Sequence, residues 1–188
     1  MKKSAPQLHT APMGELISLD VVKDAVSFPS DEPDTLLQGV VTGAIEYLDG
    51  YSGVLGRCLM TQTWEQRFTG FERQIRLPFI TVSSAEISYV DSSGLSQNVE
   101  TNLYEVAQDA RGSYVRFRSG FKFPSLDDQD FPVQIRMVSG YGTAADVPWL
   151  IKVAVLAIVN ACFDDEPGEW CDLPPVRSAM TQFRRVVL

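Results

Sequence analysis

The chain has 188 residues, of which 45% are hydrophobic and 21% charged, and its formal net charge at pH 7 is −8. This length suits one domain with an embellishment, and the composition excludes both a wholly disordered chain and a fibrous repeat. The acidic balance opposes sequence-independent binding of nucleic acid, which needs a basic face that displaces counterions from the phosphates.

Neither the apolar runs nor the cysteines indicate a membrane anchor or a secreted scaffold. The longest apolar run, Val153 to Val159, is far below the roughly 20 residues that cross a bilayer, and residues 1–14 lack the apolar stretch of a signal peptide. We therefore expect synthesis in the cytoplasm and no membrane partner. The cysteines are odd in number and form no C-x-x-C pair, which favours packing thiols over disulfides or a zinc site (Cys58, Cys162 and Cys171).

The chain begins with an irregular stretch. Residues 1–16 have no sustained period and contain Pro6 and Pro12, so we expect a flexible N-terminal arm, with an ordered strap on a partner as the alternative. Ser18 can then cap a short helix over residues 19–26.

A longer amphipathic helix is predicted next. It opens at Asp31 or Asp34, and its apolar residues hold one face of a 3.6-residue period as far as Leu48. Gly39 and Gly43 lie one turn apart in this helix. Each costs up to about 1 kcal/mol relative to Ala, which close packing of a neighbouring helix could offset.

The middle of the chain has the alternation of β-strands. From about Leu59 the apolar period changes to two, and Ser92-Ser93-Gly94 is typical of a hairpin turn. We expect an antiparallel meander over about residues 59–140. Its further strands are predicted at Gln74–Leu77, Ala85–Asp91, Leu103–Ala107, Tyr114–Arg118 and Val133–Ser139.

The helical period then returns. Pro148 fits the first turn of an apolar helix that should end near Asp164, and a final short helix is predicted over about residues 175–184. The order of elements predicts an α+β fold: a small core of about four helices with an antiparallel β-sheet insertion between the second and third. One domain should cover residues 17–185, with a C-terminal tail over residues 182–188.

The sequence offers few residues that are suited to catalysis. The single histidine, His9, lies in the predicted arm, so no triad, Cys-His pair or histidine metal site is predicted. Acidic residues cluster at 127–130 and 164–166 without the spacing of a calcium loop, and no phosphate-binding glycine motif occurs. We interpret both clusters as solvated loops and predict no catalytic residue, metal or cofactor.

Basic and aromatic residues leave two alternatives open. The scattered basic residues of the sheet indicate a solvent face with ordinary salt bridges rather than a nucleic-acid surface (Arg67, Arg73, Arg76, Arg116, Arg118 and Lys122). Arg184-Arg185 followed by three apolar residues suits either an insertion peptide or a frayed tail. Trp149 and Trp170 could each anchor the core or an interface.

Four stretches, in this order, carry a resemblance to a known family. They are Ile17 to Lys23 before an acidic turn at 31–34; Ala44 to Gly53 leading into Leu59-Met60-Thr61-Gln62-Thr63-Trp64; Ile75-Arg76-Leu77-Pro78 followed by Ile87 to Asp91; and Ser139-Gly140-Tyr141-Gly142 before Val147-Pro148. With them the chain resembles, from about Ile17 to Arg185, the head-tail connector (adaptor) proteins of long-tailed phages and gene transfer agents. One departure is that Val54-Leu55-Gly56 precede Arg57, where many relatives have Arg directly after the glycine.

The resemblance implies a structural, non-enzymatic subunit of the virion neck. It implies a twelve-membered ring between the portal protein and a stopper or tail-terminator protein, with genomic DNA passing through the channel without specific binding. By position, the resemblance makes the C-terminal tail the portal-binding segment (Gln182, Phe183, Arg184, Arg185, Val186, Val187 and Leu188). The alternatives are a stopper or tail-completion protein of the same neck, and a metal-dependent hydrolase using the Asp127–Asp130 carboxylates.

Overall fold

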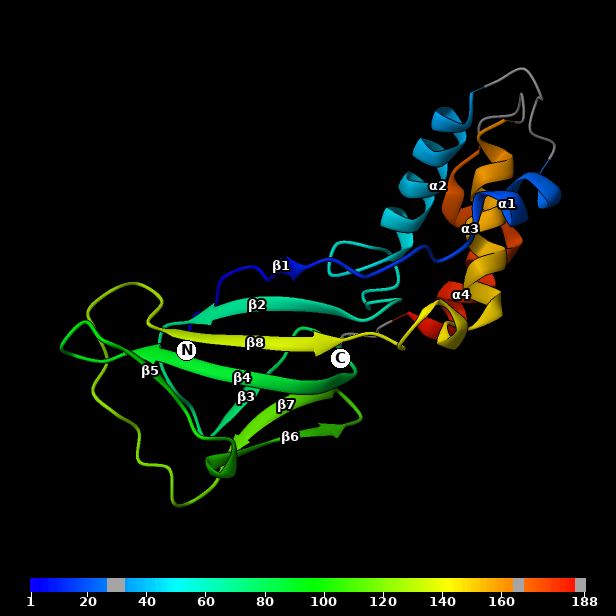
Figure 1. The fold of residues 1–188 in the computed structure, drawn as a ribbon. Helices are drawn as coiled ribbons and strands as arrows, with labels where there is room; N and C mark the ends of the chain where they lie inside the picture. Colours follow the sequence, from blue (N-terminus) through cyan, green and yellow to red (C-terminus); the bar gives the residue numbers. More distant parts are fainter. Residues whose placement is uncertain (27–32, 164–167, 185–188) are drawn as a thin grey trace. The chain divides into compact units, whose positions relative to one another are not determined.

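The computed structural model describes residues 1–26, 33–163 and 168–184, and the chain divides into two compact units. Among the described residues, the β unit consists of Met1–Pro12 and Thr61–Gly140, and the helical unit lies within Met13–Met60 and 141–184. Figure 1 shows that the α-helices belong to one unit and the strands to the other. This arrangement confirms the predicted α+β class, with the sheets inserted between the second and third helices.

The described part of the helical unit contains four α-helices: α1 (Leu19–Ala25), α2 (Asp34–Leu48), α3 (Trp149–Ala161) and α4 (Pro174–Phe183). All four predicted helices are therefore confirmed, within a few residues at their ends. Helix α4 begins one residue earlier than predicted, because a proline has no N–H to lose in the first turn. None of the described helices is long and apolar enough to span a membrane.

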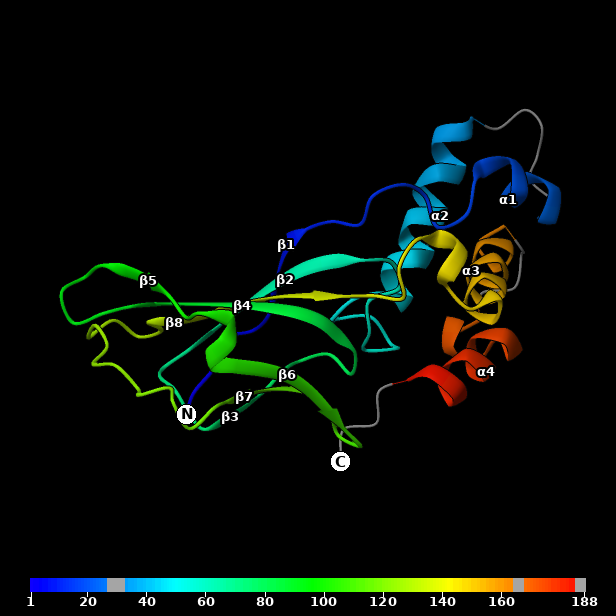
Figure 2. The same cartoon turned by 60° about the horizontal axis from the view of Figure 1, so that its bottom comes forward.

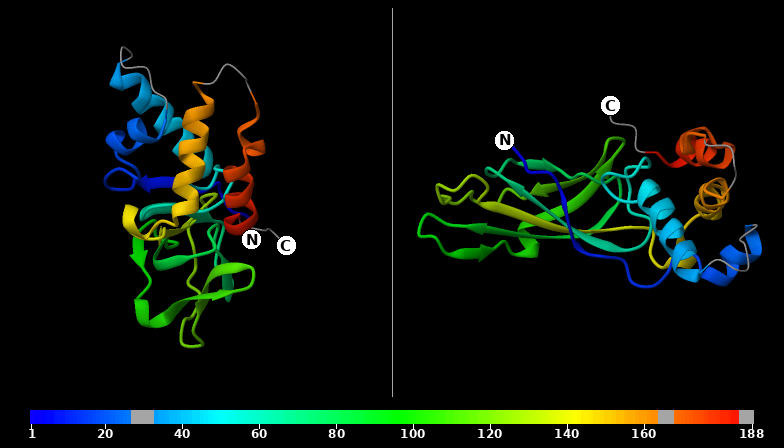
Figure 3. Two further views of the ribbon diagram at one scale, coloured as in Figure 1. Left: turned by 90° about the vertical axis from the view of Figure 1, so that its right-hand side faces the viewer. Right: turned by 90° about the horizontal axis from the view of Figure 1, so that it is seen from above.

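One apolar core holds these helices together. The stripe of α2 buries Leu37, Val41, Ala44 and Leu48, whose spacing follows the helical period. Helix α3 buries five residues, and fully burying each isoleucine contributes roughly 1.5–3 kcal/mol (Ile151, Ala154, Val155, Ile158 and Val159). Figure 3 shows α4 running alongside α3, and α4 adds two buried residues to the same core (Val176 and Ala179).

Two antiparallel sheets form the β unit. The larger has the strand order β1-β2-β8-β4-β5 and the smaller the order β3-β7-β6; Figure 2 shows the smaller sheet beneath the larger. The strands are β1 (Gln7–Thr10), β2 (Gln62–Phe68), β3 (Gln74–Arg76), β4 (Val82–Val90), β5 (Ser96–Asn98), β6 (Tyr104–Asp109), β7 (Gly112–Phe117) and β8 (Val133–Ser139).

The strand order differs from the expected meander. The last strand, β8, lies between β2 and β4 instead of at an edge. Every second residue along its seven positions is buried, and it pairs with Gln62–Phe68 on one side and with β4 on the other. Periodicity predicts that a strand has one buried face, but it does not identify the neighbours of that strand.

Two short edge strands were absent from the predictions. Strand β1 lies within the expected arm, and all four of its residues are exposed. Strand β5 follows the predicted turn, where Gly94 adopts a φ of 77° and donates its N–H to the Asp91 carbonyl at 2.8 Å. Neither strand has a buried alternating face, so neither has the period that identifies a strand.

The two sheets share an apolar interior. Phe68, Ile135 and Met137 of the larger sheet and Phe117 of the smaller are almost fully buried. The Tyr104 hydroxyl of β6 donates a hydrogen bond of 2.7 Å to the Ala85 carbonyl of β4, which ties one sheet to the other. Burial raises the pKa of Tyr104 above its ordinary value, because the phenolate would lose its hydration.

Candidate assembly surfaces

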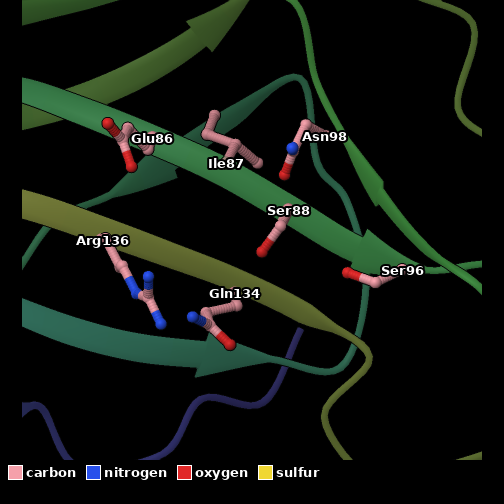
Figure 4. Close-up of a pocket in the computed structure, with 7 residues that line it drawn as sticks. All are labelled: Glu86, Ile87, Ser88, Ser96, Asn98, Gln134 and Arg136. Carbon is pink, nitrogen blue, oxygen red and sulfur yellow. The ribbon is translucent and has the colours of Figure 1, made fainter.

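The open face of the larger sheet is polar. Figure 4 shows a hollow on this face lined by residues of β4, β5 and β8 (Glu86, Ile87, Ser88, Ser96, Asn98, Gln134 and Arg136). Beside it, Glu65 of β2 accepts hydrogen bonds from Gln134 at 2.8 Å, Arg136 at 3.3 Å and Arg67 at 3.0 Å. The Glu65 side chain is only 13% exposed, and these two arginines balance its charge. This is a hydrated, charge-paired surface.

The smaller sheet also pairs its outward charges. Arg76 donates to both carboxylate oxygens of Asp109, at 2.6 and 2.9 Å, and Arg116 pairs with Glu105. The bond from Arg76 lowers the pKa of Asp109 to about 2. For Arg67, Arg76 and Arg116 the predicted reading as ordinary salt bridges is therefore confirmed.

The carboxylate clusters gain no catalytic partner in the described structure. Asp128 and Asp130 are exposed, and Asp127 accepts the N–H of Gln129 at 3.0 Å within its own loop. Among the described residues, one group of side chains could hold a metal ion, Glu169 with Cys171 and Asp172, and it lies on an exposed turn. His9 is exposed on β1. The residues 164–166 lie outside the described part of the chain.

An apolar groove lies on the helical unit, along the N-terminal half of α2. We call it the glycine groove; it holds about 400 Å³ and is lined by Thr35, Leu36, Gly39, Val40, Gly43, Cys162 and Trp170. A Cβ atom at Gly39 or Gly43 would meet nothing within 4 Å outside its own helix. No helix in the described part of the chain packs on these glycines, so close packing that would offset their cost is not found among the described residues.

The two tryptophans of the helical unit have different environments. Trp170 is half-buried, meets the Tyr47 ring edge-on with centroids 5.2 Å apart, and forms one wall of the glycine groove. Trp149, at the start of α3, is 62% exposed, which makes it the most exposed large aromatic side chain among the described residues. The Lys152 ammonium lies 5.3 Å from the centroid of its ring. Trp170 therefore anchors the core, while Trp149 does not.

The family motifs meet in the loop between α2 and β2. Arg57 donates to the Tyr141 hydroxyl at 2.6 Å, and Tyr141 donates its backbone N–H to the Leu59 carbonyl at 3.1 Å. A Cβ at Gly53 would lie 2.2 Å from the Asp49 carbonyl oxygen, so only glycine fits there. Arg57 thus joins the Tyr-Ser-Gly turn to the Gly-Tyr-Gly segment, despite the three residues that precede it.

A second glycine of these motifs, Gly142, lies where the Asp146 side chain leaves no room for a Cβ atom. Gly142 has a φ of 133°, and a Cβ there would lie 2.5 Å from the Asp146 carboxylate. That carboxylate accepts hydrogen bonds from the backbone N–H and the hydroxyl of Thr143, at 2.8 and 2.7 Å, and these bonds lower its pKa. The motif therefore shapes the entry into α3.

The predicted portal-binding segment begins at the end of α4. Gln182 is exposed, Phe183 is half-buried against the helical core, and Arg184 is exposed in extended backbone just after the helix. The structure thus places the first residues of this segment at the surface of the helical unit. The remaining four, Arg185, Val186, Val187 and Leu188, lie outside the described residues.

No protein-family profile and no curated protein matches the sequence. Solved structures share its fold. A chain of the "Virion of native gene transfer agent (GTA) particle" aligns with a TM-score of 0.77 and 17% identity, over 98% of this chain and 97% of that chain. Chains of the "Neck of empty GTA particle computed with C6 symmetry" and the "Neck of native GTA particle computed with C12 symmetry" align over the same shares, with TM-scores of 0.77 and 0.76.

These matches extend over nearly the whole length of both chains. At 17% identity they establish a shared fold, including both the helical unit and the inserted sheets. The fold of this chain is therefore one that occurs in structures of the neck of a phage-like particle.

Proposed function

We propose that this chain is an adaptor subunit of a virion neck, forming a ring between the portal and the stopper or tail of a tailed phage or phage-like particle. The fold shared with neck structures over 98% of the chain carries the proposal. The exposed sheet faces, which pair their charges instead of presenting reactive groups, agree with a structural role.

A twelve-membered ring is the assembly we infer. The similar neck structures were computed with C6 and C12 symmetry, which a closed ring of identical subunits satisfies. Repeating a subunit of net charge −8 makes a strongly acidic assembly. A channel wall with the same sign of charge as DNA lets the polymer pass without adhering to it.

Contact with the portal is assigned to the C-terminal tail, Gln182 to Leu188. Arg184 stands exposed directly after the last turn of α4 and can bind a carboxylate of another protein. The apolar residues that follow it in the sequence offer side chains for a pocket. The segment would thus combine a charged and an apolar contact, as interface anchors commonly do.

Pull-down with purified partners tests the assignment as adaptor. We expect the chain to co-sediment with portal rings at physiological salt. Retention by a tail-terminator protein, with none by portal rings, would instead assign the chain to the stopper or tail-completion position. If imaging of the particle neck showed that another polypeptide forms the layer next to the portal, the adaptor role would be rejected.

Deletion of Arg184 to Leu188 tests the tail. The deletion should reduce co-sedimentation with portal rings while the melting temperature stays unchanged, because it begins at Arg184, which is exposed after the last turn of α4. The matched control is Arg177→Ala, which removes an exposed cation of α4 that pairs with Asp172 in the turn before this helix. Equal binding by the deletion and the control would show that the tail does not contact the portal.

A further inference from the structure

The glycine groove and Trp149 form complementary features of one subunit. The groove has mostly apolar walls and two glycines that leave room for a large side chain. Trp149 is a large, rigid and mostly exposed aromatic side chain, the type most often found at the centre of interfaces. Both belong to the helical unit, so their relative positions are set within one compact body.

A subunit cannot fill its own groove with this side chain. Trp149 is the first residue of α3, and Cys162, which lines the groove, directly follows its last residue. At 1.5 Å per residue the two positions are about 20 Å apart along the helix. A Trp149 side chain placed in the groove would therefore belong to another copy of the chain.

The charges beside the two features are opposite. Lys152 lies against the Trp149 ring, and no ion pair is formed by it among the described residues. Glu46 is exposed and follows Gly43 by three residues, so it continues the face of α2 that carries the glycines. No cation of the described chain pairs with it either. Lys152 is three residues from Trp149, and Glu46 is three residues from Gly43. Insertion of the indole into the groove therefore brings Lys152 toward Glu46.

Ring symmetry requires this kind of pairing. A cyclic ring of more than two subunits is built from a heterologous interface, in which two different patches of the same chain meet. We propose that Trp149 of one subunit inserts into the glycine groove of the next copy, with Lys152 of the first pairing with Glu46 of the second. This inference rests on the proposed ring function and names the contact that closes the ring.

Chemical cross-linking in assembled particles tests the contact. In a Trp149→Cys, Cys171→Ser variant, the new thiol should lie close to the native Cys162 thiol in the groove of the neighbouring copy. A short homobifunctional maleimide should then give a ladder of covalent oligomers under denaturing conditions, with a linked peptide pair containing positions 149 and 162. Adding Cys162→Ser should abolish the ladder.

The matched control places the thiol elsewhere on the same unit. Val21 on α1 is also exposed, and Val21→Cys in the Cys171→Ser background should give no ladder. If the Trp149→Cys chain is present in the neck without a 149–162 link, the contact is wrong and the neck function stands. A link from Cys162 to a different particle protein would assign the groove to that protein. Absence of the unmodified chain from the neck would overturn the function and the contact together.

Filling the groove and exchanging its charges give independent readouts. Gly43→Leu should keep the melting temperature of the free subunit or raise it, since a Cβ there meets open space and glycine is a poor helix former. The same change should remove the subunit from particles.

Lys152→Glu should lower incorporation about tenfold, and adding Glu46→Lys should restore it. Normal incorporation of Gly43→Leu, or no restoration by the double exchange, would overturn the proposal.

Discussion

The surfaces of the β unit and the helical unit differ in character. The β unit encloses its aromatic interior between two sheets and pairs outward charges on both, as Glu65 does with Arg67 and Arg136. The helical unit leaves an apolar groove open beside α2 and exposes Trp149. Paired polar faces remain hydrated, whereas open apolar surface gains free energy when a partner covers it. This difference agrees with the proposed contact between copies through the helical unit.

The largest expected effect tests whether each unit has its own core. Ile158→Ala removes a fully buried side chain from α3 and should destabilise the helical unit by about 2–5 kcal/mol. Hydrogen exchange should become faster in α2, α3 and α4 and stay slow in β2 and β8. The matched change in the β unit, Ile135→Ala, should give the reverse pattern. Equal acceleration in both units by either variant would mean that they unfold as one.

A smaller effect concerns the link between the two sheets. Tyr104→Phe removes the hydroxyl that donates to the Ala85 carbonyl and should cost about 1 kcal/mol in the free energy of unfolding. Urea denaturation measures it, and Tyr51→Phe, at an exposed position, is the control. A Tyr104→Phe variant as stable as the control would show that the bond does not hold the sheets together.

The smallest effect concerns the charge pairs of the β unit and is read as a pKa. Asp109 is held at a pKa of about 2 by Arg76, below its ordinary value of 3.8. A carboxyl whose pKa is lowered by folding stabilises the folded state at pH values above its ordinary pKa. This stabilisation is lost as the pH falls from 3.8 through about 2. Arg76→Gln should return the pKa toward 3.8 in an NMR titration, while Arg116→Gln, which leaves the pair intact, should not. A low pKa that persists in Arg76→Gln would mean that backbone donors alone hold it.

The sequence predicts the elements of this fold better than their arrangement. The stripe from Leu37 to Leu48 and the alternation in β8 both come from burial of one face, so both could be recognised by period alone. The placement of β8 between β2 and β4 depends on contacts between distant residues, which no local pattern encodes. Strands β1 and β5 are edges without a buried face, so their sequences carry no period.

The same reasoning explains what could be predicted of the assembly surfaces. Gly39 and Gly43 were recognisable as costly residues in a helix, but the sequence could not show that they face an open groove. The contrast between Trp149 and Trp170 depends on which face of the helical core each reaches, and equal alternatives were left for both. The ion pair of Arg116 with Glu105 joins the neighbouring strands β7 and β6, and that of Arg76 with Asp109 reaches across β7 from β3 to β6. Both follow from register once the strand order is known.

The brevity of the outer strands of the larger sheet has a consequence for solubility. Strand β1 has four residues and β5 has three, so each boundary of this sheet offers few free backbone groups to another polypeptide. Wherever many copies are brought together, long open boundaries would let separate sheets fuse into an aggregate. Short edge strands favour selective contacts between side chains. Many copies can then lie close together at high local concentration without their sheets joining.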